Sequence, residues 1–324
     1  MAPRAQNLPW TESPFFEKEL SESSLSDEDK AFVRSFEQNG YIVFDPEIPD
    51  SLIDALNSSM APTLEKTPVG DKRVQDAWAY NDYVRQVAVS ETVLAKLRLL
   101  YQREPIPFQT LNFPVGTQQP THSDMVHFNS IPQRFMCGVW MAFEDITENN
   151  GPLHYYPQSH KLPFYDMIDL GVKASDNIET KKAIMAYAVD YTNFIQEMIQ
   201  ALKLKKQTLT IKKGQAMIWS ANLLHGGEKI NTPGASRHSQ VTHYYFEDCI
   251  YYIPRLSDIA INKLYLNNLT NIKTGKKVVN TYFGEEVKTP VKLQLQQSTV
   301  KMLSKVSHLF PKEVVAKIKS ILVR

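Results

Sequence analysis

The feature that most constrains this chain is a series of short apolar runs between residues 108 and 247, separated by turn-forming residues. The runs are rich in valine, isoleucine, threonine and aromatic residues, which is typical of β-strands. Seven or eight such strands favour a sandwich or a barrel. The predicted strands are 108–113, 126–129, 135–144, 153–156, 208–211, 216–220 and 239–247.

Helical patterns precede and interrupt these strands. Apolar residues at helical spacing lead up to Gly40, which predicts a helix that ends there, followed by a strand at 41–44. Further helices are predicted at 49–60 and 91–100. A longer helical stretch, 178–204, lies between two β blocks. We expect it to be an insertion that either closes over a substrate as a lid or covers the sheet as a structural helix.

Composition restricts the class of protein. A chain of 324 residues with 43% apolar content can bury a sizeable core without disulfides or a structural metal. Thirty-six basic against 35 acidic side chains leave a net charge of +1, so no nucleic-acid partner is expected. The two cysteines, Cys137 and Cys249, are too far apart in sequence for a thiolate zinc motif, and we expect reduced thiols. The sequence contains no apolar leader or membrane span, which favours a cytoplasmic protein.

The two ends of the chain differ from the middle. Residues 1–25 are polar and contain proline, which predicts an arm lying on the surface of the main domain, 26–290. Residues 291–324 carry seven basic side chains and one acid, and their apolar residues recur at helical spacing on either side of Pro311. This basic amphipathic tail can bind an anionic membrane or an acidic partner, or it can pack on the β core or on a second subunit. The oligomeric state stays open.

Two histidines and one aspartate lie in contexts typical of metal ligands. His122 and Asp124 are two residues apart, so on a strand their side chains point to the same face. His225 follows the buried strand 216–220 and precedes two glycines, which allow a close approach of backbone or ligand. Two histidines and one carboxylate form the facial triad of non-haem Fe(II) oxygenases, which leaves positions open for a co-substrate and for O2.

A basic residue downstream suits a dicarboxylate. Strand alternation places Arg237, Ser239, Val241 and His243 on one face of the last long strand. Arg237 can bind a carboxylate through two parallel hydrogen bonds while Ser239 donates a third, an arrangement suited to 2-oxoglutarate. For His243, substrate contact and core packing are equally open.

Six segments of the chain, in order and spacing, resemble the phytanoyl-CoA dioxygenase (PhyH-like) family. The resemblance implies a double-stranded β-helix (jelly-roll, cupin-like) core, with flanking helices, that carries Fe(II) on His122, Asp124 and His225. It also implies that Arg237 and Ser239 bind 2-oxoglutarate, and that Asn112 and Trp140 line the co-substrate pocket. The segments are His122-Ser123-Asp124, Asn150-Gly151-Pro152-Leu153, Pro157-Gln158-Ser159-His160-Lys161, Lys213-Gly214-Gln215-Ala216, Leu224-His225-Gly226-Gly227 and Arg237-His238-Ser239.

We therefore expect a dioxygenase that uses Fe(II), 2-oxoglutarate and O2 to hydroxylate a small-molecule or carrier-bound metabolite, with release of succinate and CO2. Two alternatives stay open. The first is a catalytically silent β-helix that acts as a binding or scaffold protein. The second is a cupin-like isomerase or hydrolase that uses the same metal ligands. Neither the fold nor the triad specifies the substrate.

Overall fold

A computed structural model describes residues 7–65, 73–172 and 186–287. The chain divides into two units after Val278. In the second unit the described residues form a hairpin of β12 (Thr281–Tyr282) and β13 (Glu285–Glu286). The predicted tail, 291–324, and the first part of the predicted insertion lie outside the described residues.

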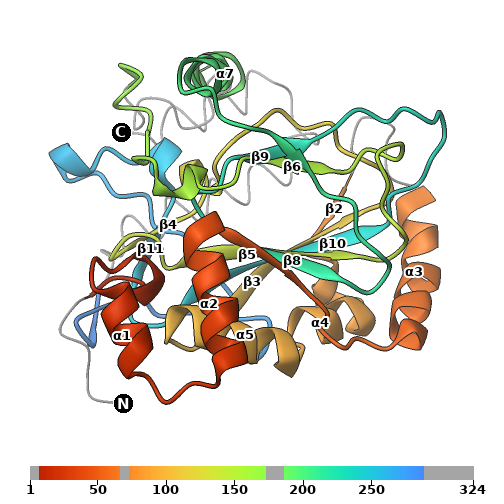
Figure 1. Cartoon of the computed structure of the whole chain (residues 1–324), viewed down its shortest axis with the longest axis horizontal. Coiled ribbons are helices and arrows are strands. Elements are labelled where there is room, and N and C mark those ends of the chain that lie inside the picture. Colours follow the sequence, from red (N-terminus) through yellow and green to blue (C-terminus); the bar gives the residue numbers. More distant parts are fainter. Residues whose placement is uncertain (1–6, 66–72, 173–185, 288–324) are drawn as a thin grey trace, which may run out of the picture. The chain divides into compact units, whose positions relative to one another are not determined.

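The first unit is built on a six-stranded sheet in which all neighbouring strands are antiparallel. Its two central strands, β5 and β10, are buried along their whole length. Helices α2 (Asp27–Asn39), α4 (Asp82–Ala88) and α5 (Glu91–Tyr101) lie on one side of this sheet, and strands β6 (Leu153–Tyr155) and β9 (His225–Gly227) lie on the other (Figure 1). In spatial order the strands are β1 (Tyr41–Phe44), β8 (Ala216–Ser220), β5 (Met136–Ala142), β10 (Ser239–Phe246), β3 (Pro105–Phe113) and β2 (Val74–Gln75).

A second layer of short strands faces this sheet. It contains a three-stranded sheet with the order β7, β6, β9 and a two-stranded pair of β11 and β4. From β3 to β11 the chain passes back and forth between the two layers, and this winding confirms the predicted double-stranded β-helix. The strands are β4 (Asn129–Ile131), β6 (Leu153–Tyr155), β7 (Gln207–Thr208), β9 (His225–Gly227) and β11 (Ile250–Tyr252).

The helices of the first unit follow the predicted order. Helix α2 begins after Ser26, whose hydroxyl accepts a hydrogen bond from the Asp29 amide, and ends at Gly40 with φ of 79°. The α-helices are α1 (Phe16–Glu22), α2 (Asp27–Asn39), α3 (Asp50–Glu65), α4 (Asp82–Ala88), α5 (Glu91–Tyr101) and α7 (Thr192–Ala201). Short helical turns are η1 (Trp10–Glu12), η2 (Ala77–Ala79), η3 (Asp124–Val126), η4 (Ser159–Lys161), η6 (Ala186–Tyr191), η7 (Pro254–Leu256) and η8 (Ile259–Ile261).

Strand alternation places the side chains of the large sheet in two of the core clusters. On β8, Ala216 and Ile218 join the cluster between the large sheet and the helices. Met217 and Trp219 join the cluster between the two layers. Successive side chains of a strand point to opposite faces, so each central strand contributes to both clusters. The inner cluster forms part of the wall around the candidate site.

The described part of the predicted N-terminal arm, 7–25, does not simply lie on the surface. Trp10, Phe16 and Leu20 are buried in the cluster beneath the large sheet. The Trp10 indole also donates a hydrogen bond of 2.9 Å to the Leu100 carbonyl oxygen in α5. Phe15 of this segment is exposed, but the apolar side chains of Trp10, Phe16 and Leu20 complete the core despite their polar surroundings in the sequence.

Two predicted strands also need correction. Residues 126–129 are not a strand, because η3 occupies Asp124–Val126 and β4 begins only at Asn129. The Ser123 hydroxyl accepts a hydrogen bond from the Met125 amide, which favours this turn over an extended chain. The strand predicted at 208–211 is shorter, since β7 covers only Gln207–Thr208.

The described part of the predicted insertion contains η6 and α7. Ile195 and Ile199 of α7 pack with Val126, Tyr156 and Leu224, on the outside of the second layer.

Within residues 7–65, 73–172 and 186–287, no helix has both the length and the apolar content needed to cross a membrane.

Candidate metal centre and co-substrate pocket

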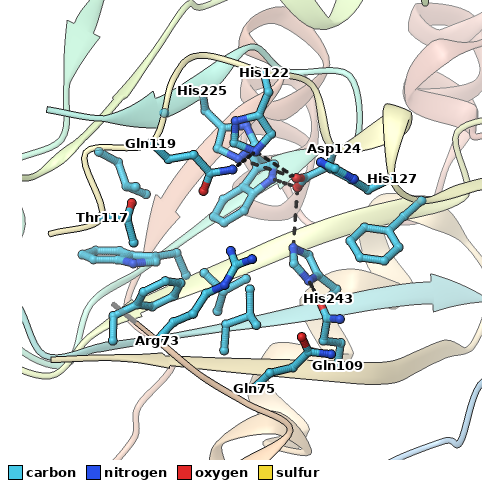
Figure 2. A pocket seen from close by; sticks show the side chains of 18 of the residues that line it. Arg73, Gln75, Gln109, Thr117, Gln119, His122, Asp124, His127, His225 and His243 are labelled. Atoms are coloured by element: carbon cyan, nitrogen blue, oxygen red, sulfur yellow. Dashed lines mark hydrogen bonds and ion pairs between the residues drawn. The ribbon is translucent and has the colours of Figure 1, made fainter. Parts of the chain in front are cut away.

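The fold brings His122, Asp124 and His225 together in the space between the two layers. The imidazole Nε2 of His122 lies 3.5 Å from the Asp124 Oδ1, and that of His225 lies 3.8 Å from the same oxygen (Figure 2). One potential ligand atom from each residue lies within 4.8 Å of the other two. All three side chains are buried. One metal ion could bind all three, as a facial triad requires.

The backbone around the triad explains how residues about 100 positions apart meet. His122 and His225 form a two-way bridge, in which each amide donates to the other's carbonyl oxygen at 2.9 and 3.0 Å. His122 and Asp124 were expected on one regular strand, but they do not share one. Asp124 instead begins η3, and this turn brings its carboxylate back toward the two imidazoles.

Both histidines are held in the tautomer that a metal requires. The Nδ1 of His122 lies 2.9 Å from the Pro120 carbonyl oxygen, and that of His225 lies 2.9 Å from the Leu223 carbonyl oxygen. A carbonyl oxygen only accepts, so each Nδ1 carries the proton and each Nε2 keeps a lone pair for a metal. Burial also lowers the pKa of His225 to about 4, so this imidazole is neutral near pH 7.

Asp124 is held as a carboxylate by its surroundings. Burial alone would raise its pKa, but the adjoining His225, His122 and His243 outweigh burial and hold that pKa well below the ordinary value. The Trp219 indole donates a hydrogen bond of 2.8 Å to Oδ2. This contact leaves Oδ1 beside the two histidine Nε2 atoms.

His243 adjoins the same carboxylate from β10. Its Nε2 lies 3.6 Å from the Asp124 Oδ2, and its Nδ1 donates to the Gln109 Oε1 at 2.9 Å. Figure 2 shows the chain of contacts from Gln109 through His243 to Asp124. His243 therefore lies at the site and is not simply packed in the core.

A cavity of about 410 Å³ opens beside the triad, within the usual size range of small-molecule sites. Arg237, Val241 and His243 all line it, as alternation along the strand predicts. Ser239 is buried but is not among the lining residues, and its hydroxyl lies 3.4 Å from the Arg237 carbonyl oxygen. No described residue of α7 lines the cavity, although the Tyr191 hydroxyl that precedes α7 accepts a hydrogen bond from the Ser123 amide.

Arg237 is a buried cation with unused donors. Its side chain is 1% exposed, and its Nε and Nη1 have no hydrogen-bond partner within the described part of the chain. Burial lowers the pKa of Arg237 to about 10, so the guanidinium stays charged near pH 7. A buried charge without a partner is costly, which makes this wall of the cavity suited to an anion.

Of the two residues that the resemblance placed in the co-substrate pocket, one lines the cavity and the other does not. Trp140 lines the cavity, and the Arg237 guanidinium lies 5.6 Å from its ring centroid. Asn112 does not line the cavity, because its neighbours Leu111 and Phe113 do and strand alternation turns it to the other face. There its amide donates to the Gln240 Oε1 at 3.1 Å.

Several polar residues of the cavity were not predicted from the sequence. Trp219 belongs to a strand whose alternation could have placed it on the inner face, although nothing local shows its contact with Asp124. Gln119 lies three residues before His122, and its Nε2 is 3.3 Å from the His122 Nε2. Gln109 of β3 was also missed, as were Arg73, Gln75, Thr117 and Arg255, which come from short or irregular segments.

Solved structures similar to this chain share its fold at low sequence identity. The carbocyclase SnoK from nogalamycin biosynthesis has a TM-score of 0.53 and 15% identity, covering 70% of this chain and 87% of its own. The epimerase SnoN of the same biosynthesis has a TM-score of 0.53 and 15% identity, with coverages of 78% and 96%. EctD from S. alaskensis has a TM-score of 0.53 and 18% identity, with coverages of 76% and 83%.

Sequence comparison extends this result beyond the fold. No curated protein sequence matches the chain significantly. The family model described as phytanoyl-CoA dioxygenase (PhyH) matches residues 36–239, which is more than half of the chain and includes His122, Asp124, His225 and Arg237. With the double-stranded β-helix and the His-Asp-His cluster in place, this match shows that the chain belongs to the phytanoyl-CoA dioxygenase family.

Proposed function

We propose that this chain is an Fe(II)- and 2-oxoglutarate-dependent dioxygenase that hydroxylates a small-molecule or carrier-bound metabolite. The observation that carries the proposal is one cavity with two complementary ends. At one end lie two imidazoles and a carboxylate, and at the other lies the buried guanidinium of Arg237 with unpartnered donors. A dicarboxylate that also binds a metal satisfies both ends.

The donor set suits Fe(II). Two imidazoles and one carboxylate leave up to three coordination positions for other ligands, whereas a structural zinc site is closed by four protein ligands. The related fold of EctD is described with 2-oxoglutarate and 5-hydroxyectoine, and that of SnoN with Fe3+ and α-ketoglutarate. These descriptions support the same cofactors for this chain.

When bound, iron and 2-oxoglutarate together activate O2, with conversion of 2-oxoglutarate to succinate and CO2. The residues of the chain prepare the site for this chemistry. His122 and His225 present Nε2 because backbone carbonyl oxygens hold the proton on Nδ1. Trp219 orients the Asp124 carboxylate. Arg237 binds the distal carboxylate of 2-oxoglutarate, with the rings of Phe113 and Trp140 beside the guanidinium.

Hydroxylation is the outcome we propose among several that this fold supports, since the similar structures include a carbocyclase and an epimerase. We also propose a cytoplasmic location, in keeping with the free, buried thiols of Cys137 and Cys249. Docking of the basic segment 291–324 on a membrane or a partner is a further proposal, which rests on its sequence alone.

The test is cofactor-dependent turnover by the full chain. Protein loaded anaerobically with Fe(II) should consume O2 and form succinate only when 2-oxoglutarate is present. His122→Ala, Asp124→Ala or His225→Ala should abolish turnover, because a triad that loses one ligand holds its metal poorly. Arg237→Gln should raise the KM for 2-oxoglutarate about 30-fold or more, since loss of a buried charge partner costs about 2 kcal/mol or more. Arg85→Gln, on the surface of α4, is the control and should change neither value.

Other outcomes would refute the proposal and identify the alternative. Full activity of Asp124→Ala would remove the triad assignment. Turnover of a metabolite without 2-oxoglutarate would favour a metal-dependent isomerase or hydrolase. Absence of metal and 2-oxoglutarate binding would favour a binding or scaffold protein.

A further inference from the structure

The segment that carries two of the three triad residues has an outer face as well as a cavity face. His122 and Asp124 line the cavity, whereas the residues before and between them, Thr121 and Ser123, do not. Ser123 instead lines a shallow pocket on the outside of the second layer, beside Ile195 of α7. Both Thr121 and Ser123 are buried. Contacts made on this outer face can therefore determine where the two ligands lie.

The first outer contact comes from Tyr191, the residue directly before α7. Its hydroxyl accepts a hydrogen bond of 3.2 Å from the Ser123 amide, which is the backbone donor between the two ligands. The Tyr191 side chain is buried and belongs to one apolar cluster with Val126 of η3 and Ile195 of α7. Tyr191 therefore holds the outer side of the turn that begins with Asp124.

The second outer contact comes from His154 of β6. The Thr121 hydroxyl lies 2.7 Å from the His154 Nε2, and the His154 Nδ1 lies 3.0 Å from the Glu228 Oε1. A carboxylate attracts the ring proton to Nδ1, which leaves Nε2 as the acceptor for the Thr121 hydroxyl. Lys206, which follows α7 in the chain, binds the same Glu228 oxygen at 2.6 Å. Both flanks of α7 are thus connected to the segment of the metal ligands.

His154 also touches the strand that carries the third ligand. It pairs with Gly226 across β6 and β9, and a Cβ on Gly226 would lie 2.7 Å from the His154 Nε2. One imidazole therefore contacts the neighbour of His225 and the neighbour of His122. The backbones of these two ligands are joined by hydrogen bonds of 2.9 and 3.0 Å in both directions. A shift on the outer side of this bridge would move both metal-binding imidazoles.

We propose that Tyr191 and His154 are positioning residues of the metal centre, and that the described part of the insertion braces the triad from outside. Each side chain fixes the backbone beside a ligand, so the triad is arranged before a metal arrives and binding does not have to order it. The inference rests on the proposed function, because it assigns these contacts to the metal site proposed there.

The experiment is anaerobic calorimetric titration of the full apo protein with Fe(II). Tyr191→Phe and Thr121→Val each remove one hydroxyl and nearly keep the shape of the side chain. Each should raise the Kd for Fe(II) about 3- to 10-fold, because a hydrogen bond between neutral groups that preorganises the ligands is lost. Thr121→Ser keeps the hydroxyl and should bind Fe(II) nearly as tightly as the unaltered chain.

Tyr101→Phe is the matched control. The Tyr101 hydroxyl is also buried and donates to a backbone carbonyl oxygen, that of Met136, at 3.2 Å. Tyr101 belongs to α5 and to the cluster between the large sheet and the helices, away from the triad. Its variant should lower the Tm of the apo protein and leave the Kd for Fe(II) unchanged. A merely structural Tyr191 would give the same result as this control.

Hydrogen exchange provides a second measurement that needs no variant. Coupling between two sites is reciprocal, so a brace that favours metal binding must itself be stabilised by the metal. Saturation with Fe(II) should therefore slow amide exchange in α7, 192–201, of the unaltered chain. Tyr191→Phe should reduce this slowing at least about twofold, whereas Tyr101→Phe should not change it.

An unchanged Kd in Tyr191→Phe or in Thr121→Val would refute the role of that contact. Equal losses in Thr121→Ser and Thr121→Val would show that the hydroxyl is not responsible. Exchange in α7 that Fe(II) does not alter would overturn the brace even if a variant fails to fold. Failure of the proposed function appears separately, because the unaltered chain would then not bind Fe(II) at all.

Discussion

Replacing Trp219 with phenylalanine should weaken metal binding by the triad while leaving the fold intact. The Trp219 indole donates a hydrogen bond of 2.8 Å to the Asp124 Oδ2, and both side chains are buried. Phenylalanine keeps the aromatic packing between the layers but removes the donor. The His243 Nε2 also faces Oδ2, but at 3.6 Å it is too distant for a normal hydrogen bond and does not replace the lost contact.

The size of the effect follows from the kind of bond. A hydrogen bond to a charged group contributes about 1.5 to 3 kcal/mol, which corresponds to about 10- to 100-fold in an equilibrium constant. Removing a residue that hydrogen-bonds to a metal ligand lowers the affinity for the metal by a similar factor, about 10- to 100-fold. We therefore expect the Kd for Fe(II) to rise by this factor.

Trp140 provides a matched control in the same cavity. It is 0% exposed and Trp219 is 2% exposed, yet the Trp140 indole has no hydrogen-bond partner in the described part of the chain. Anaerobic calorimetric titration with Fe(II), without 2-oxoglutarate, should show near-normal affinity for Trp140→Phe and weakened affinity for Trp219→Phe. The Tm of each apo variant checks folding. Equal losses in both variants, or no loss in Trp219→Phe, would refute the reasoning.

Two further predictions concern residues outside the cavity. Burial lowers the pKa of His160 from 6.5 to about 4, so the folded state favours the neutral imidazole. The contribution of this group to folding stability is present above pH 6.5 and is lost as the pH falls toward 4. In urea unfolding of the apo protein, the free energy of unfolding should be lower at pH 5 than at pH 7, with about 2 kcal/mol of the decrease coming from this group. His160→Gln should reduce this difference between the two pH values. An unchanged difference would contradict the assignment. Asn112→Ala should lower the free energy of unfolding by about 1 kcal/mol through the lost bond to Gln240, with an unchanged KM for 2-oxoglutarate. A large rise in that KM would return Asn112 to the co-substrate pocket.

Local patterns in the sequence were enough for most of the strands, for several of the helices, and for the residues of the His-Asp-His cluster. Alternation along the last long strand placed Arg237, Ser239, Val241 and His243 on one side, and all of these except Ser239 line the cavity. Strand 216–220 and the helix that ends at Gly40 also appear as predicted. These features depend on periodicity and turn chemistry within a few residues, and such signals are present in the sequence itself.

Other features depended on which segments pack together. The resemblance placed Asn112 in the co-substrate pocket, but the position of β3 in the sheet turns Leu111 and Phe113 to the cavity and Asn112 away from it. Trp10 is buried because it packs with distant parts of the chain, such as Leu100 of α5, which lies 90 residues further along. The bond from Trp219 to Asp124 and the approach of Arg73 and Arg255 join segments separated by 95 residues or more. Such contacts follow from the register of strands and the stacking of layers, and no local pattern in a single sequence records them.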